Sequence, residues 1–112
     1  MLLGVAIGDA LGNTSEGWLP KGRKQHFGRI EGYLPNRYVN DERRGFPSDD
    51  TQMTFWLVEH LLKHSQFIPA QLAAVFAERH IFGMGSSVRQ FRSNFAASKP
   101  WDRAGPKSAG NG

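Results

Sequence analysis

Apolar residues fill the first part of the chain almost without interruption. Residues 2–12 contain a single charged side chain, Asp9, among Leu, Val, Ala, Ile and Gly. A helix that is apolar on all sides is a buried one, so we predict a buried helix over residues 2–12. Gly4, Gly8 and Gly12 recur every four residues and therefore share one stripe of that helix. Because each glycine costs a helix up to ~1 kcal/mol relative to alanine, the stripe indicates close approach by a neighbouring element, most simply another helix.

The periodic pattern disappears between residues 13 and 47. This stretch holds seven of the chain's 14 Lys and Arg residues, three prolines, and aromatic side chains such as Trp18 and Tyr38. A connection this long without structure is uncommon in a compact domain unless it is functional or mobile, and the aromatic residues favour a functional one. We therefore predict a long functional loop over residues 17–47 that lies over a site. A disordered insertion is the alternative.

Helical periodicity returns in the second half of the chain. After Ser48 or Asp49, either of which can cap a helix, apolar residues recur every three or four positions to about residue 65. Pro69 begins a second predicted helix that closes at residues 82–83. A third follows Gly85, with Ser86 or Ser87 as its cap. No segment alternates apolar and polar residues in the manner of a strand, so the predicted fold class is all-α.

Composition narrows the function classes. The chain has 112 residues, a net charge of +4 and no cysteine. This length suits one domain at most, and the missing cysteines exclude disulfides and thiolate chemistry, which fits a reducing, cytoplasmic setting. The apolar start has neither the basic flank of a secretory signal nor the ~20 apolar residues of a membrane span. Since the chain starts inside a helix and stops inside a loop-like stretch, we expect both ends to be cut.

Carboxylates supply the first candidates for chemistry. Ser48, Asp49, Asp50 and Thr51 place four oxygen-bearing side chains in a row, which suits a hard cation such as Mg²⁺ or Mn²⁺. The same residues are also an ordinary start of a helix. Asp9 is expensive to bury without a partner, so we expect it to cap a neighbouring helix or to orient a metal-bound water. Glu16 follows that helix and could serve as an acid or base.

Three further segments contain residues that could bind a ligand or a metal. Gly83-Met84-Gly85 lies between two predicted helices, where its backbone amides could cradle a phosphate or simply end one helix and start the next. Ser108, Gly110 and Asn111 provide small residues for close backbone approach and one amide side chain. His60 and His64 have the spacing of a metal pair, but without an evident third ligand we expect a satisfied pair on a helix surface.

Taken in order, these segments resemble the N-terminal part of the ADP-ribosylglycohydrolase family. The matching segments are residues 4–12, Glu16, residues 48–54, residues 83–85 and residues 108–112. The resemblance implies an orthogonal all-helical bundle around a dinuclear Mg²⁺ or Mn²⁺ centre. Residues 1–112 would form the N-terminal part of a single domain, truncated at its C-terminal side.

The resemblance also implies roles for single residues. Ser48, Asp49 and Asp50 would ligate metal; Glu16, Asp49 and Asp50 would be catalytic; and Asp9, Gly83, Gly85, Ser108, Gly110 and Asn111 would contact the ligand. The implied reaction is hydrolytic removal of ADP-ribose from ADP-ribosylated protein side chains or related conjugates. The complete enzyme would act as a monomer, without membrane or nucleic acid.

One family element is missing from these residues. The family completes its metal site with a second motif, Asp-x-Asp-Thr/Ser, which this sequence does not contain. We therefore expect the isolated chain to be an inactive fragment with exposed apolar faces. The alternative is a non-catalytic helical module that binds ADP-ribose or nucleic acid through the basic, aromatic stretch of residues 18–46.

Overall fold

The computed structural model describes residues 1–107, and this part of the chain is built from helices. They are α1 (Leu2–Gly12), the 3-10 turn η1 (Asn13–Ser15), α2 (Pro20–Phe27), the 3-10 turn η2 (Arg37–Val39), α3 (Asp49–Lys63), α4 (Pro69–Glu78), α5 (Ser86–Ala96) and α6 (Trp101–Ala104). Residues 1–107 contain no strand, only an isolated bridge between Asn36 and Glu42. The all-α prediction is confirmed. None of the helices described is long and apolar enough to cross a membrane.

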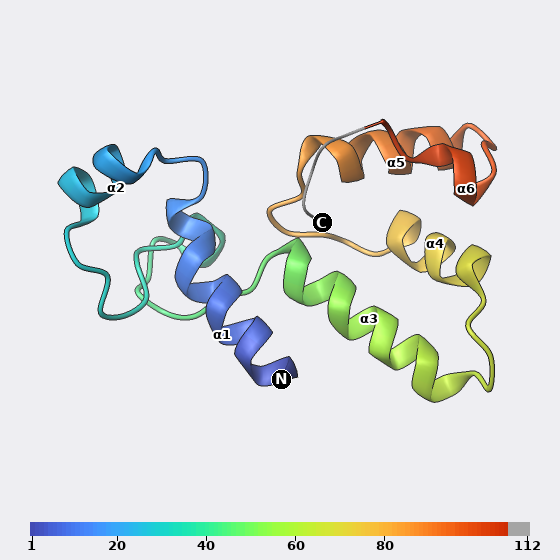
Figure 1. The fold of residues 1–112 in the computed structure, drawn as a ribbon, viewed down its shortest axis with the longest axis horizontal. Coiled ribbons are helices and arrows are strands. Elements are labelled where there is room, and N and C mark those ends of the chain that lie inside the picture. The colour runs from blue at the N-terminus through green and yellow to red at the C-terminus, as the bar shows by residue number, and fades with distance from the viewer. Residues whose placement is uncertain (108–112) are drawn as a thin grey trace.

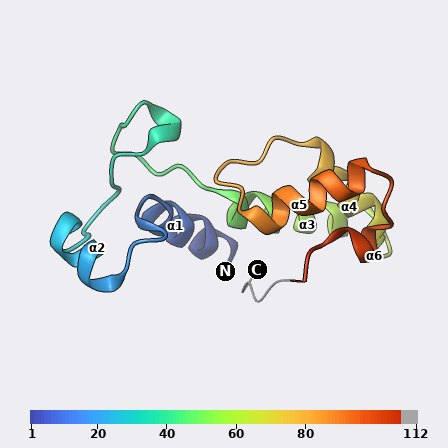
Figure 2. The same ribbon diagram turned by 90° about the horizontal axis from the view of Figure 1, so that it is seen from above.

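The helices form two groups joined by the segment that precedes α3. Helices α1 and α2 with the turns around η2 make up one group, α3 to α6 make up the other, and α1 packs against α3 where they meet (Figure 1). The view from above shows the same division (Figure 2). The radius of gyration is 15.9 Å, against about 13 Å for a compact domain of roughly this length. The arrangement is therefore elongated, measuring 44 × 29 × 25 Å.

The buried apolar core is small. Its members are Ala10, Val39, Leu72, Ala73, Ile81 and Ala104. Many large apolar side chains remain exposed instead, among them Leu3, Ile7, Trp18, Leu19, Phe55, Leu61, Leu62, Phe67 and Trp101. Burial of apolar surface is the main stabilising contribution in folding. Because residues 1–107 bury little of it, hydrophobic burial stabilises this part of the chain only weakly.

Helix α1 is much less buried than its composition predicts. Only Ala10 is buried, whereas Leu3 is 71% exposed and Ile7 41%. A Cβ added at Gly4, Gly8 or Gly12 would meet no heavy atom within 4 Å. For the described residues, the predictions of a buried helix and of an element packed on the glycine stripe are both wrong. The apolar composition of a helix shows that it can be buried. Burial also requires another element of the fold to pack against it.

The stretch predicted as a loop contains a helix. Helix α2 occupies Pro20–Phe27, and none of its residues is buried. Since no apolar stripe faces a core, the periodicity that reveals helices is missing here. Its end signals are nevertheless present: Pro20 at the first turn, and Gly28 just after the last turn with a φ of 63°.

Helix α4 ends at Glu78, earlier than the predicted closure at residues 82–83. Two hydrogen bonds join the segment after this helix to α3. The Gln52 side chain donates to the His80 carbonyl (3.0 Å) and accepts from the Phe82 amide (2.8 Å). Residues 80 and 82, which are not helical, are thereby bonded to α3. Helix α5 then begins at Ser86 with Gly85 as its N-cap residue.

The turn between α3 and α4 is organised by a buried histidine. His60 is only 5% exposed, and its Nε2 accepts a hydrogen bond from the Ile68 amide at 3.1 Å. The rings of His60 and His64 lie 4.5 Å apart. The expectation of a surface pair is thus wrong for His60, which provides a hydrogen bond for the turn that leads into α4.

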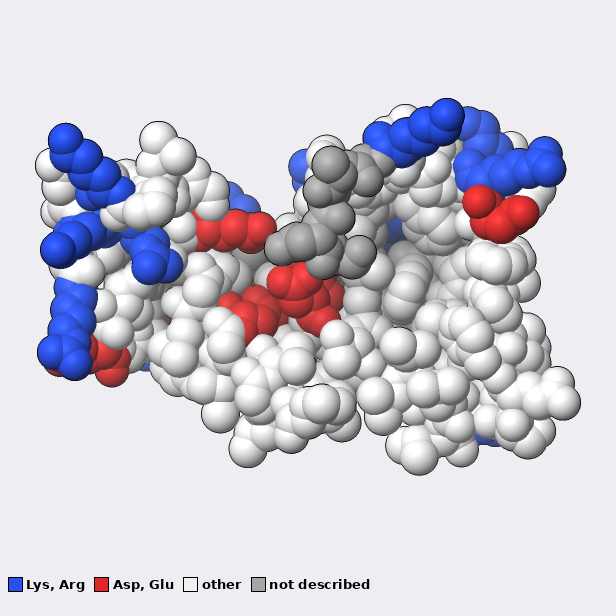
Figure 3. Space-filling model, in the orientation of Figure 1, with Lys and Arg blue, Asp and Glu red and all other residues white. Residues whose placement is uncertain are grey.

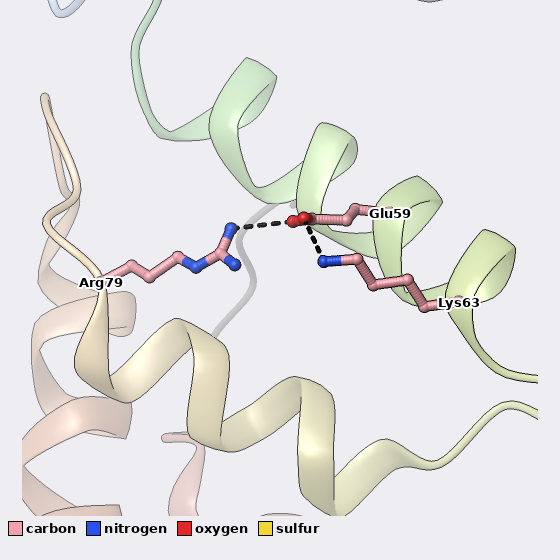
Figure 4. Close-up of polar contacts among 3 residues, drawn as sticks. All are labelled: Glu59, Lys63 and Arg79. Atoms are coloured by element: carbon pink, nitrogen blue, oxygen red, sulfur yellow. Dashed lines mark hydrogen bonds and ion pairs between the residues drawn. The ribbon is translucent and has the colours of Figure 1, made fainter.

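A surface ion-pair group also joins these two helices. Glu59 on α3 receives hydrogen bonds from Lys63 (2.6 Å) and from Arg79 just beyond α4 (2.9 Å), as Figure 4 shows. Both hydrogen bonds lower the pKa of Glu59, and the one from Lys63 has the larger effect. Because the pairs are exposed, they contribute little stability. Arg79 also stacks over the Trp56 ring, with 5.3 Å from guanidinium carbon to ring centre.

We predict that Gly4→Ala stabilises the chain by about 0.5–1 kcal/mol, because alanine favours a helix and nothing in the described residues occupies the space of its Cβ. Thermal unfolding followed by circular dichroism measures the change. An unchanged or lower melting temperature would show that the glycine stripe faces a partner in solution.

Candidate functional site

The carboxylate of Asp9 organises the start of α3. Its Oδ2 accepts hydrogen bonds from the Ser48 amide (2.7 Å), the Thr51 amide (3.3 Å) and the Thr51 hydroxyl (2.6 Å). Its Oδ1 accepts from the Ser48 hydroxyl (2.6 Å) and from Asn13 Nδ2 (3.2 Å). A helix start leaves backbone amides without partners, and here a carboxylate from another helix accepts one of them. The prediction that Asp9 caps a neighbouring helix is confirmed.

Ser48 does not cap α3 with its own side chain. It is the N-cap residue by position, but its hydroxyl donates to Asp9 rather than accepting from the first turn of the helix. Ser48 and Thr51 are both buried, at 4% and 6% exposure. The segment that carries Asp49 and Asp50 is therefore held by buried hydrogen bonds on both sides.

An amide network extends this frame toward η2. Asn13 donates to Asp9 and also to the Phe46 carbonyl at 2.7 Å. Its side-chain oxygen accepts from Asn36 Nδ2 at 3.3 Å, and Asn36 in turn accepts from the Tyr38 amide at 2.9 Å. Sequence reasoning missed Asn13 and Asn36. The available signal was the position of Asn13 one helical turn after Asp9.

The pKa values of Asp9 and Asp50 shift in opposite directions. Burial alone would raise the pKa of Asp9, but the hydrogen bonds from Ser48, Thr51 and Asn13 outweigh it and hold the pKa below its ordinary value. Burial, together with the charges of Asp49 and Asp9, raises the pKa of Asp50. Acidic side chains gather at the middle of the face drawn in Figure 3, whereas Lys and Arg lie toward its edges. The site thus concentrates negative charge, and the hydrogen bonds at Asp9 stabilise that carboxylate in its ionised form.

A hollow of about 740 Å³, the acidic hollow, lies beside this cluster. Its polar lining residues are Asp9, Asn13, Ser15, Glu16, Arg23, Ser48 and Asp50, and Gly8, Gly12 and Trp18 also line it. The structure therefore brings Asp9, Glu16, Ser48 and Asp50 together as candidate site residues. Asp49 lines a second hollow, shared with Asp50 and apolar residues of α3 to α5.

Side-chain oxygen atoms at the start of α3 could bind one side of a hard divalent cation. Ser48, Asp49 and Asp50 offer oxygen atoms, the ligands that Mg²⁺ and Mn²⁺ prefer. The Asp50 carboxylate accepts no hydrogen bond from the described residues. A cation beside it would offset both the burial and the repulsion by Asp49 and Asp9 that raise its pKa. Within residues 1–107, however, no group of three or more His, Cys, Asp or Glu side chains is arranged to hold a metal ion. The residues fit one side of a metal site.

The glycine segment folds onto the start of α3. Gly83 has a φ of 69°, and a Cβ there would lie 2.9 Å from the Ser48 Cβ. The Gly83 amide donates to the Tyr38 hydroxyl at 3.0 Å, and the Gly85 amide to Asp49 Oδ2 at 3.5 Å. Both amides predicted to cradle a phosphate therefore already have acceptors within the chain. Tyr38 and Gln52, which hold this segment, were not anticipated from the sequence.

Three predicted ligand contacts, Ser108, Gly110 and Asn111, lie outside the described residues. Their assignment stays a prediction.

Comparison with known proteins places the sequence in a family. Residues 1–112 match the ADP-ribosylglycohydrolase family model. The chain belongs to this family. The match covers the whole sequence, including Asp9, Glu16 and the Ser48-Asp49-Asp50 segment.

Two relatives extend the comparison. An uncharacterized protein of Archaeoglobus fulgidus is 33% identical over 108 residues, which cover 93% of this chain and 35% of that protein. The uncharacterized protein YegU of Escherichia coli is 40% identical over 76 residues, covering 63% of this chain and 22% of its own length. The chain thus spans about a third or less of the relatives it matches. No solved structure matches it.

We predict that Asp9→Asn destabilises the chain by roughly 1–2 kcal/mol at neutral pH, because an amide group would face donors that now bind a carboxylate and partial exposure screens the loss. Since the pKa of Asp9 is lowered on folding, its contribution is fully present above the ordinary aspartate pKa of about 3.9 and is lost as the pH falls through the folded-state value. Urea unfolding from pH 7 to 3 should therefore show the two proteins converging in acid. Asp102→Asn, an exposed position on α6, is the control and should show no such pH-dependent difference. A constant gap between wild type and Asp9→Asn would contradict the capping role.

We further predict opposite outcomes at the two ends of the glycine segment. Gly83→Ala should cost roughly 1–3 kcal/mol, because it combines a positive φ with a close contact to Ser48. Gly85→Ala should change the free energy of unfolding by less than about 0.5–1 kcal/mol, since its φ is −69° and the space around it is open. Equal losses in chemical denaturation would show that the Gly83 segment does not dock on α3.

Proposed function

We propose that this chain carries part of the active site of a metal-dependent hydrolase that removes ADP-ribose from ADP-ribosylated protein side chains or related conjugates. Family membership supports the substrate class. The observation that carries the proposal is the start of α3, where Asp9 holds the Ser48-Asp49-Asp50 segment beside a hollow that Glu16 also lines. Asp50 takes no part in this capping network, so its carboxylate is available to a cation at the hollow.

Each residue has a distinct role in this proposal. Ser48, Asp49 and Asp50 would hold Mg²⁺ or Mn²⁺, which polarises a bound oxygen and lowers the pKa of a bound water. Asp9 is a positioning residue, because it acts through the hydrogen bonds that set Ser48 and the helix start. Glu16 is exposed at the same hollow and would accept or deliver a proton at the reacting centre.

The glycine-containing segments would lie against the ligand. Gly83 and Gly85 are proposed ligand contacts, but a phosphate at their amides would have to replace the Tyr38 hydroxyl and the Asp49 carboxylate as acceptors. Ser108, Gly110 and Asn111 are proposed contacts on the strength of the family motif alone.

The second metal motif of the family, Asp-x-Asp-Thr/Ser, does not occur in these 112 residues. Carboxylates from one side alone leave most positions around two divalent ions to water. We therefore propose that turnover requires ligands from outside this sequence and that the isolated chain binds without hydrolysing. Binding of ADP-ribose or RNA without any metal requirement would favour the alternative, a non-catalytic binding module.

Calorimetric titration of ADP-ribose into the purified chain, with and without Mn²⁺, tests the proposal. We predict metal-dependent binding by the wild-type chain and its loss in Asp50→Asn. In the absence of metal, Asp50→Asn should not lower the free energy of unfolding, because it removes a carboxylate whose ionisation the folded state disfavours.

Asp102→Asn again serves as the charge-matched control and should bind as the wild type does. Equal binding with and without Mn²⁺, or binding that survives Asp50→Asn, would contradict the assigned metal role. Absence of ADP-ribose binding by the wild type in either condition would contradict the ligand-binding part of the proposal for this chain.

A further inference from the structure

The acidic hollow has an electrostatic problem as a site for an anionic ligand. Three of its lining residues, Asp9, Glu16 and Asp50, are carboxylates. ADP-ribose carries a pyrophosphate, so a ligand of the class proposed above brings further negative charge. Cations at the carboxylates would offset part of this repulsion, but the phosphate groups still need donors along the wall of the hollow.

Arg23 is the one Lys or Arg side chain among the described residues that lines this hollow. It forms no ion pair within residues 1–107, where the Lys and Arg residues in ion pairs are Arg29, Arg44, Lys63 and Arg79. Its guanidinium therefore remains available, although carboxylates line the same space. A planar guanidinium can donate two parallel hydrogen bonds to a phosphate, which the ammonium of lysine cannot match in geometry.

Aromatic contacts join α2, the helix that carries Arg23, to Trp18 just before it. The Trp18 ring stacks on His26 at 4.8 Å between ring centres and meets the edge of Phe27 at 5.5 Å. Trp18 also lines the acidic hollow. This packing ties the helix that carries Arg23 to the wall of the hollow, beside an indole that is 46% exposed.

Among the described residues, the two backbone donors expected from the sequence are occupied. The Gly83 amide is bonded to Tyr38, and the Gly85 amide has Asp49 as its acceptor at 3.5 Å. Arg23, by contrast, can accept an anion without breaking a hydrogen bond or ion pair found in residues 1–107.

We propose that Arg23 is a ligand-binding residue that pairs with the phosphate groups of the ligand in the acidic hollow, with Trp18 as the adjoining wall. The inference rests on the proposed function, because it takes the ligand to be an ADP-ribosyl compound. It places the pyrophosphate in the middle of that ligand toward α2 and the terminal ribose, which carries the bond to be hydrolysed, toward Asp50.

Neighbouring positions on α2 provide the test. Lys24 also carries a positive charge, but it lines a different hollow together with Arg29 and does not line the acidic one. Wild type, Arg23→Gln, Arg23→Lys and Lys24→Gln are titrated with ADP-ribose in the presence of Mn²⁺. Mn²⁺ binding without ADP-ribose and the circular dichroism spectrum are recorded for each, so that loss of the metal site or of the fold is recognised.

Loss of one charge-assisted phosphate contact predicts that Arg23→Gln binds ADP-ribose about tenfold more weakly or worse, while Lys24→Gln stays within about twofold of wild type. Arg23→Lys should fall between them, because it keeps the charge and loses the paired donors. Mn²⁺ binding should be the same in all four proteins.

Four results would overturn the inference. Equal weakening of ADP-ribose binding by Arg23→Gln and Lys24→Gln would show general attraction to a basic helix. Wild-type affinity in Arg23→Gln would show that Arg23 does not contact the ligand. Both results leave the proposed function intact. If Arg23→Gln does not fold, wild-type affinity in Arg23→Lys overturns the paired contact. Failure of the wild type to bind ADP-ribose at all would overturn the proposed function and this inference with it.

Discussion

The hydrogen bonds between Asp9 and the start of α3 are the interaction on which the rest of the site depends. They join a carboxylate at the end of the first helix to residues 39 and 42 positions further along the chain. A charged acceptor in a partly buried place is stable only when donors surround it, and Ser48, Thr51 and Asn13 supply them. Because the same bonds fix Ser48 and the turn that carries Asp49 and Asp50, the fold and the candidate site share one origin.

The surroundings of the two aspartates of the site shift their pKa values in opposite directions. Asp9 is fully satisfied and its pKa is lowered, whereas Asp50 is unpartnered and its pKa is raised. The two aspartates thus differ in how readily they ionise because of the donors and charges around them, not because of their side-chain chemistry.

The described part of the chain buries little apolar surface. Large apolar side chains of α1 and α3 are exposed, and no large side chain in the described part is fully buried. The relatives that match this chain are about three or more times as long as the matched part. Polar contacts such as those of Asp9, Gln52 and His60 therefore carry an unusually large share of the long-range order.

Much of the local structure could be read from the sequence. The helical periods of α1, α3 and α5, the all-α class, and the capping role of Asp9 follow from spacing and from the cost of an unpaired carboxylate. Helix α2 could not be read in the same way, since it has no buried stripe. Even so, Pro20 and Gly28 marked its ends.

The sequence by itself determined which residues offer oxygen atoms to a cation, most of the segments that form helices, and the family to which they correspond. Only the tertiary structure decided their surroundings: that Ser48 donates to Asp9 instead of capping its own helix, that the Gly83 amide is bonded to Tyr38, and that His60 is buried. It also decided that Arg23 lines the acidic hollow and Lys24 does not. The reason is physical: composition and spacing limit the bonds that a side chain is able to make, whereas the partner it meets depends on where distant segments come together.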